Sequence, residues 1–239
     1  MRKVLIAIQA RSTSQRLPQK VHMQVGGKPI LQWVIEACQN AAGYLQRDRQ
    51  QLQFSVTTAL LIPRGDAIKS IYGSQVEVIE GDEHDVLSRY VEAQRKTECD
   101  YLVRVTADCP RIPTYLIAKH IKSAIMRERD YTTNVHYRTF PEGFDCEVIS
   151  RRLILWLDKN ATTKEDREHV TSRIAQGSDF PFYDFDSKQS VCHILNDADE
   201  SDQKTSIDTK EEYEELVAMF QRLRDKHNQA KKAGTVFIK

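Results

Sequence analysis

The most constraining feature of the sequence is a short apolar run that passes directly into a long polar loop. Residues 4–8 read Val-Leu-Ile-Ala-Ile, which is typical of a strand buried on both faces of a parallel sheet. The loop runs to Lys20, and a helical apolar pattern begins after Pro29. This order of strand, loop and helix predicts an α/β domain.

Strand-like and helical patterns alternate through the first half of the chain. We expect strands at residues 4–8, 54–59, 76–79 and 101–105, and helices at residues 29–42, 65–72, 85–97 and 114–128. Strands that alternate with helices form parallel sheets through right-handed crossovers. The 239 residues suffice for one such domain, and we expect a single domain over residues 1–239 with a mostly parallel central sheet.

The second half of the chain is less regular. We expect strands at 131–134, 146–149, 182–185 and 191–194, and helices at 153–157, 165–176 and 209–229. A small α+β lobe over residues 131–185 is expected to supply the pocket of a second substrate. Residues 196–204 are very polar and predict an exposed loop, while the stripe on the last helix predicts a core or dimer contact: Tyr213, Leu216, Val217, Phe220 and Leu223.

Three cations lie in the loop after the first strand: Arg11, Arg16 and Lys20. The loop also carries hydroxyl groups, including those of Ser12 and Ser14, and it has no acidic residue. Open α/β sheets bind ligands at the carboxyl ends of their strands, which is where this loop begins. The pattern favours an anion, above all a polyphosphate, over the alternative of a solvated basic loop.

Two aspartates follow predicted strands. Asp108 comes after the apolar run 101–105, where its carboxylate is well placed to hold Mg²⁺ against a phosphate. The next helix begins near Thr114, too late for Asp108 to cap it. Asp208 ends a short predicted strand at residues 206–207 and precedes a helix, so a metal ligand and a helix cap are equally good interpretations. Thr209 and Glu212 fit a capping box there.

Composition limits the classes of function. The formal net charge of +1 gives no support for a large nucleic-acid footprint. The five cysteines are widely spaced, which favours reduced thiols over a disulfide framework or a zinc site. The apolar run after Met1 is too short for a signal peptide, and no run reaches the roughly 18 apolar residues of a membrane span. We therefore expect a cytoplasmic protein without a nucleic-acid or membrane partner.

The loop resembles the A-R-x-x-S-x-R-L-P-x-K signature of the cytidylyltransferases that activate acidic sugars. Asp108 and Asp208 fall on the family's two metal-binding aspartate motifs, and residues 142–148 and 166–170 look like segments of its spore-coat polysaccharide branch. Together the four matches span residues 4 to about 217. Gln19 and Ala107 stand where the family usually has glycine.

The resemblance implies a Rossmann-like, GT-A-like nucleotidyltransferase fold and the transfer of CMP from CTP to an acidic sugar or related cell-surface polysaccharide precursor. It implies a homodimer, Mg²⁺ as cofactor, and Asp208 and a catalytic Asp108 as metal ligands, beside catalytic Arg11, Arg16 and Lys20. It further implies two sets of binding residues. The nucleotide set is Ala10, Ser12, Ser14, Gly81, Asp85 and Arg89, and the acceptor set is Glu142, Asp145, Glu147, Arg167, Glu168 and His169.

Other interpretations stay open from the residues alone. Asp85 can simply stabilise a helix N-terminus, and His169 can be a structural histidine. Asp197-Ala198-Asp199 matches the D-x-D of nucleotide-sugar glycosyltransferases, although it lies in a polar loop. Another nucleotidyltransferase, or a non-catalytic nucleotide-binding relative, would keep the same sheet. A small phosphorylated acceptor, such as a polyol phosphate or a small phosphorylated acid, would fit in place of the acidic sugar. The first loop lacks G-x-G-x-x-G and G-x-x-x-x-G-K-[ST], which argues against a dinucleotide enzyme or a P-loop ATPase.

Overall fold

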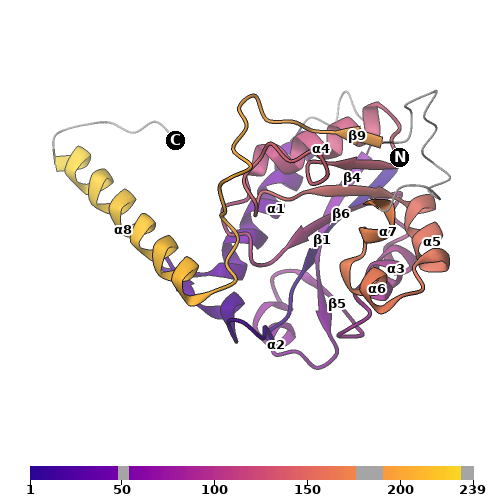
Figure 1. Cartoon of the computed structure of the whole chain (residues 1–239), viewed down its shortest axis with the longest axis horizontal. Helices are drawn as coiled ribbons and strands as arrows, with labels where there is room; N and C mark the ends of the chain where they lie inside the picture. Colours follow the sequence, from indigo (N-terminus) through magenta and orange to yellow (C-terminus); the bar gives the residue numbers. More distant parts are fainter. Residues whose placement is uncertain (48–53, 176–190, 233–239) are drawn as a thin grey trace.

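A computed structural model describes residues 1–47, 54–175 and 191–232. Its centre is a seven-stranded sheet in the order β5-β4-β1-β6-β8-β7-β9 (Figure 1). The strands along the sheet are β5 (Glu77–Gly81), β4 (Phe54–Pro63), β1 (Arg2–Gln9), β6 (Tyr101–Thr106), β8 (Glu147–Ser150), β7 (Tyr131–Thr133) and β9 (Val191–His193). The mostly parallel α/β fold predicted from the sequence is confirmed.

The parallel half of the sheet explains the apolar run at the start of the chain. β1 pairs in parallel with both β4 and β6, and β4 pairs in parallel with β5. Side chains alternate along β1, so Val4 and Ile6 enter one core cluster whereas Leu5 and Ala7 enter the other. A strand buried on both faces has no solvent side, which is why residues 4–8 are continuously apolar.

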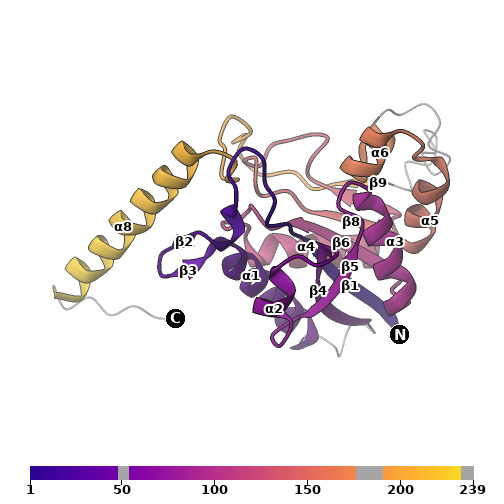
Figure 2. The same ribbon diagram turned by 90° about the horizontal axis from the view of Figure 1, so that it is seen from below.

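Helices cover both faces of the sheet, as Figures 1 and 2 show. One face is covered by α1 (Ile30–Arg47), α2 (Ile68–Tyr72) and α4 (Thr114–Met126). The other is covered by α3 (Val86–Thr97), α5 (Arg151–Asn160), α6 (Lys164–His169) and α7 (Ser172–Ala175). None of the helices within the described ranges is both long and apolar enough to span a membrane. All five cysteines are free, and four of them are buried.

The strand direction reverses beyond β6. β8 runs antiparallel to β6 and to β7, and β9 runs parallel to β7. The described part of the expected lobe therefore extends the central sheet through β7 and β8, while α5, α6 and α7 cover it. The strand expected at residues 182–185 lies outside the described residues.

Two elements differ from the sequence expectation. The helix expected at 165–176 is broken into α6 and α7 at Val170, whose φ is 58° and ψ −56°. The backbone N–H of Thr171 donates to the carbonyl of His169 at 2.6 Å, which closes a tight γ-turn around Val170. The strand expected at 206–207 is irregular chain, because the neighbouring pairing is a single bridge between Glu142 and Lys204.

The last helix, α8 (Lys210–Lys232), leaves the body of the molecule (Figures 1 and 2). Its first turns pack on a small hairpin formed by β2 (Gln24–Val25) and β3 (Lys28–Pro29). Leu216 is buried there, and the Phe220 ring lies 5.1 Å from the Trp33 ring. Leu223 is 56% exposed, so the predicted stripe is core at its start and open to a partner at its end.

Candidate active site

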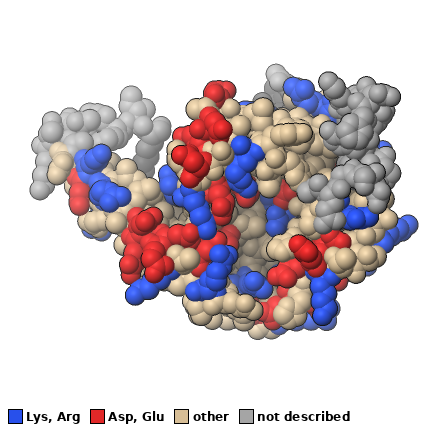
Figure 3. Space-filling model, in the orientation of Figure 1, with Lys and Arg blue, Asp and Glu red and all other residues tan. Residues whose placement is uncertain are grey.

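A cavity of about 380 Å³ opens where β1 and β6 adjoin at their carboxyl ends. The chain leaves β1 toward β4 on one side and returns to β6 on the other, which makes this the switch point where doubly wound sheets bind ligands. Figure 3 shows a hollow on this face with basic and acidic side chains gathered around it. The cavity is lined by ten of the predicted site residues: Ala10, Arg11, Ser14, Arg16, Lys20, Arg89, Asp108, Glu168, His169 and Asp208.

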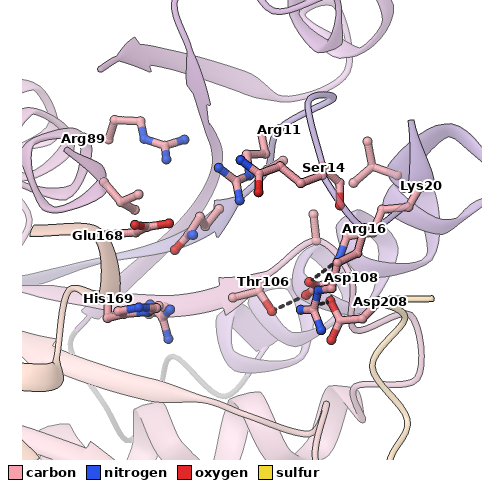
Figure 4. A pocket seen from close by; sticks show the side chains of 17 residues that line it. Arg11, Ser14, Arg16, Lys20, Arg89, Thr106, Asp108, Glu168, His169 and Asp208 are labelled. Atoms are coloured by element: carbon pink, nitrogen blue, oxygen red, sulfur yellow. Dashed lines mark hydrogen bonds and ion pairs between the residues drawn. The ribbon is translucent and has the colours of Figure 1, made fainter. Parts of the chain in front are cut away.

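One end of the cavity, the aspartate end, is formed by Arg16, Lys20, Asp108 and Asp208 (Figure 4). Lys20 Nζ donates to Asp108 Oδ2 at 2.8 Å, to Asp208 Oδ1 at 3.0 Å and to the carbonyl of Ile207 at 2.8 Å. Arg16 Nη2 lies 2.9 Å from Asp208 Oδ1. Residues far apart in the chain thus converge on one cluster of charges.

The charges of this cluster hold one another ionised. Burial opposes ionisation of Asp108, but Lys20 and the Thr106 hydroxyl hold the pKa of its carboxyl below the usual range. Burial likewise works against the Lys20 ammonium, yet Asp108 and Asp208 raise its pKa. The pKa of Asp208 is also lowered, since Lys20, Lys204 and Arg16 outweigh its partial burial. Lys20, Asp108 and Asp208 therefore stabilise one another's charged forms.

Local hydrogen bonds decide what the two aspartates can do. Thr209 and Glu212 form the predicted capping box, with Thr209 N–H donating to Glu212 Oε2 at 3.0 Å and Glu212 N–H donating to Thr209 Oγ1 at 3.3 Å. The Asp208 side chain is not needed as the cap and faces Lys20 instead. The residue before α4 is Pro113, so Asp108 does not cap that helix either.

The aspartate end fits a divalent cation bound together with phosphate. The two carboxylates lie close enough to share one ammonium group, at 2.8 and 3.0 Å. Within the described residues no group of three or more His, Cys, Asp or Glu is placed to hold a metal ion. Mg²⁺ is commonly held by one or two carboxylates, with substrate phosphates and water as its other ligands. Asp108 and Asp208 are thus the carboxylates of the cavity that fit a divalent cation bound together with a phosphate.

Ser12 anchors the cationic loop and does not line the cavity. Its backbone N–H and hydroxyl donate to the two carboxylate oxygens of Asp66 at 2.8 and 2.6 Å, and its Oγ lies 2.9 Å from Nε2 of His22. Farther along the loop, Gln19 has φ 61° and ψ 16°. This left-handed conformation favours glycine, which explains the family's glycine at this position.

Arg89 reaches the cavity through a space that Gly81 leaves. Arg89 is 1% exposed, and its Nη1 donates to the carbonyl of Leu61 at 3.1 Å. A Cβ on Gly81 would lie 2.6 Å from Arg89 Cγ, so a larger residue would push the side chain aside. Burial lowers the pKa of Arg89, and Arg11 nearby adds to the effect. Gly81 therefore supports the cavity without lining it.

Asp85 and Arg167 tie helices together outside the cavity. Asp85 Oδ1 accepts the backbone N–H of Ser88 and so caps α3. Its two oxygens also accept Nε and Nη2 of Arg167 at 2.9 and 2.8 Å, and Arg167 Nη1 contacts Asp158 Oδ1 at 3.1 Å. The geometry matches the alternative of a structural role for Asp85.

The other end of the cavity, the glutamate end, is formed by Arg104, Glu168 and His169, with Glu147 behind Arg104. Arg104 and Glu147 are cross-strand neighbours on β6 and β8, and Arg104 Nη1 donates to Glu147 Oε2 at 2.6 Å. Glu147 is 2% exposed and also accepts the hydroxyl of Tyr131. Burial disfavours both ions, but their pairing lowers the pKa of Glu147 and raises that of Arg104.

Sequence reasoning missed Arg104. A charged residue inside an otherwise apolar strand was the available signal, because such a residue must find a buried partner. Glu168 and His169 end α6, and the strained γ-turn at Val170 follows at once. Thr171, the last residue of that turn, hydrogen-bonds Glu147. The glutamate end is thereby joined from β6, through β8, to the turn.

Glu142 and Asp145 lie on the turn that braces the segment before α8. The Ser206 hydroxyl donates to Glu142 Oε1 at 3.1 Å, and Asp145 pairs with Arg138 through two bonds of 2.6 and 3.2 Å. Gly143 has φ 98°, and a Cβ there would lie 2.4 Å from the Ser206 backbone N. This turn therefore helps to set the position of Asp208, although Glu142 and Asp145 do not line the cavity.

A model of the cytidylyltransferase family matches residues 5–231, nearly the whole chain. The chain belongs to the cytidylyltransferase family. It is 27% identical over 225 residues to the spore coat polysaccharide biosynthesis protein SpsF of Bacillus subtilis, covering 93% of this chain and 88% of that protein. It is 30% identical over 112 residues to a 3-deoxy-manno-octulosonate cytidylyltransferase of Escherichia coli, covering 47% of this chain and 42% of that enzyme.

Solved structures agree with this assignment. A cytidylyltransferase from Leptospira borgpetersenii superposes with a TM-score of 0.76 at 25% identity, and all of both chains is covered. A CMP:2-keto-3-deoxy-manno-octonic acid synthetase complexed with CTP superposes with a TM-score of 0.63 at 14% identity, over 92% of this chain and 99% of that chain. At that identity the second likeness shows the fold alone. This cytidylyltransferase is therefore an enzyme with the family's α/β nucleotidyltransferase fold.

Proposed function

We propose that this cytidylyltransferase moves CMP from CTP to an acidic sugar or a related precursor of a cell-surface polysaccharide, with Mg²⁺ as its cofactor. The observation that carries the proposal is the convergence of Arg16, Lys20, Asp108 and Asp208 at one end of a single cavity. That set combines a cradle for a triphosphate with two carboxylates for a metal ion. Relatives named for spore-coat polysaccharide and for 3-deoxy-manno-octulosonate support the acceptor class.

The chemistry follows from the charges. An oxygen of the acceptor forms a bond to the α-phosphorus of CTP, the bond from that phosphorus to the β-phosphate oxygen breaks, and pyrophosphate leaves. Arg11, Arg16 and Lys20 hold the triphosphate and stabilise the charge that develops on the leaving group. Asp108 and Asp208 would hold Mg²⁺, which supplies further charge neutralisation when bound. The protein positions the two substrates and neutralises the charge of the phosphates, and no covalent intermediate is needed.

The glutamate end is the proposed acceptor site. Glu168 and His169 line the same cavity across from the aspartate end (Figure 4). Arg104 adds a partly buried cation that suits an acid group on the acceptor. Glu147, in the predicted acceptor set, acts here by holding Arg104 in place.

The nucleotide half is tested by thermal stabilisation with CTP, UTP, ATP and GTP, each with Mg²⁺. A ligand at about 100 times its dissociation constant adds roughly 2.7 kcal/mol of stability. We expect the shift with CTP, and we expect Arg16→Ala to lose it. Arg47→Ala, which removes an arginine outside the cavity, is the matched control and should keep the shift. A larger shift with another nucleotide would overturn the assignment of CTP.

The acceptor half is tested by CTP-dependent pyrophosphate release with a panel of acidic sugars, which includes 3-deoxy-manno-octulosonate and acylneuraminates, against neutral sugars. Release with an acidic sugar alone supports the proposed class, and release with neutral sugars alone contradicts it. The glycosyltransferase alternative has little support, because Asp197 and Asp199 are exposed in a loop and do not line the cavity. The homodimer and the cytoplasmic location stay predictions, and light scattering on the purified chain tests the first.

A further inference from the structure

Every carboxylate oxygen at the aspartate end already has a partner. Asp108 Oδ1 accepts the Thr106 hydroxyl at 2.6 Å, and Asp108 Oδ2 accepts Lys20 Nζ at 2.8 Å. Asp208 Oδ1 accepts Lys20 at 3.0 Å and lies 2.9 Å from Arg16, while Asp208 Oδ2 accepts Lys204 at 3.1 Å. Lys204 is shared with Glu212, at 2.7 Å, so the cations committed chiefly to Asp108 and Asp208 are Lys20 and Arg16. A divalent cation that approaches these oxygens must therefore displace a cation that already holds them.

Lys20 is also fully engaged. An ammonium group has three donors, and those of Lys20 go to Asp108, Asp208 and the carbonyl of Ile207. The Lys20 side chain is 10% exposed, so water offers it little replacement. Lys20 can contact a phosphate only by giving up at least one of these bonds. The carboxylates and the triphosphate therefore need the same Lys20 ammonium group.

We propose that Lys20 and the divalent cation compete for Asp108 and Asp208, so that metal and CTP bind tightly only together. This inference rests on the proposed function for the identity of the nucleotide. Binding of the triphosphate draws Lys20 and Arg16 away from the carboxylates, which frees those oxygens for the metal ion. Binding of the metal frees Lys20 for the triphosphate. Since the coupling is a free energy, each ligand raises the affinity for the other by the same factor.

The first test uses Mn²⁺ alone, with free Mn²⁺ measured by its EPR signal and no nucleotide present. Wild type should bind Mn²⁺ weakly. Lys20→Met removes the competing ammonium and should tighten binding by about tenfold or more, within the usual range of coupling factors. Lys28→Met is the matched control, since Lys28 also pairs with a carboxylate, that of Glu36, but lies outside the cavity. It should leave Mn²⁺ binding unchanged.

A second variant guards against loss of folding in Lys20→Met. Arg16 is 67% exposed in its side chain, so Arg16→Met should fold. It should tighten Mn²⁺ binding by a smaller factor, because Asp208 Oδ1 loses Arg16 but keeps Lys20. Asp108→Asn in the Lys20→Met background should abolish the gain, which locates the metal at this site. Equal Mn²⁺ affinities for wild type, Lys20→Met and Arg16→Met would overturn the competition.

The second test measures CTP binding in EDTA by calorimetry. With Asp108→Asn and Asp208→Asn together, Lys20 is free for the phosphates, so metal-free CTP should bind about tenfold more tightly than to wild type. In the Lys20→Met background the same two substitutions should give little gain, whereas general loss of negative charge would give the full gain in both backgrounds and would contradict the proposal. If CTP binds neither wild type nor any variant, in EDTA or with Mg²⁺, the proposed function fails, while the Mn²⁺ titration still decides the competition because it contains no nucleotide.

Discussion

The two ends of the cavity pair cations with carboxylates in different ways. At the aspartate end the ions come from a loop, a strand tip and the start of a helix, and their side chains range from 10% exposed for Lys20 to 67% for Arg16. At the glutamate end, Arg104 and Glu147 sit on neighbouring strands inside the sheet, and their side chains are 18% and 2% exposed. The first arrangement can exchange partners with a ligand, whereas in the second a buried Glu147 fixes Arg104 at the cavity wall. Damage to the first end should cost activity alone, whereas loss of Glu147 at the second end should also cost stability.

The largest expected effect comes from Glu147→Gln. Glutamine cannot neutralise Arg104, and an unpaired buried charge costs about 3–5 kcal/mol. We expect that loss in the free energy of unfolding, measured in urea. The matched control is Glu128→Gln, which breaks the exposed pair with Arg2 and should cost no more than about 1 kcal/mol. Equal losses for the two variants would show that the glutamate end is not built into the core.

The corresponding change at the aspartate end is Asp108→Asn. Lys20 keeps Asp208 and the Ile207 carbonyl as partners, so the fold should persist. We expect the turnover of pyrophosphate release to fall by about 10²–10³-fold, the usual cost of losing one preorganised electrostatic contact. Asp197→Asn, in an exposed loop, should leave turnover unchanged. An Asp108→Asn enzyme with wild-type turnover would exclude this carboxylate from the chemistry.

Low pH should also lower the stability of the protein, through a histidine in the core behind the glutamate end. His120 lies in α4, which packs against β7 and β8, and burial lowers its pKa from 6.5 to about 4. Between these values the unfolded chain binds a proton that the folded chain does not, so stability falls as the pH falls from 6.5 toward 4. From about pH 7 to about pH 5 this single histidine should remove about 2 kcal/mol. Urea titrations of wild type and His120→Gln at both pH values test this, and identical pH slopes would contradict it.

The smallest effect should come from the loop that feeds the aspartate end. Gln19→Gly relieves the left-handed strain at φ 61° but gives the unfolded chain more freedom, so stability should change by less than about 1 kcal/mol. Gln19→Val should lower stability by about 1–2 kcal/mol, because a β-branched residue tolerates this conformation poorly. Urea unfolding, with CTP-induced thermal shifts, distinguishes the two. A valine variant as stable as wild type would show that the turn is not maintained.

Prediction from sequence succeeded where the signal was local. The buried strand at residues 4–8, the alternation of strands and helices and the capping box at Thr209 each depend on neighbours in the chain. The prediction of one helix at 165–176 was wrong in one respect, because the turn at Val170 divides it into two helices. Helix propensity gives no warning of such a turn, because strain of this kind persists only when tertiary contacts hold it.

The sequence by itself determined the parallel sheet, the cationic loop and the two aspartates, since periodicity and strand ends are properties of adjacent residues. The tertiary structure decided the partners. It joined Lys20 to Asp108 and Asp208 across 88 and 188 residues of chain, and it joined Arg104 to Glu147 across 43. It also paired Asp85 with Arg167 outside the cavity, and it placed Glu168 and His169 in the cavity wall. The strength of an ion pair depends on the distance between its charges in space and on their burial. The pattern of residues along a chain gives neither quantity.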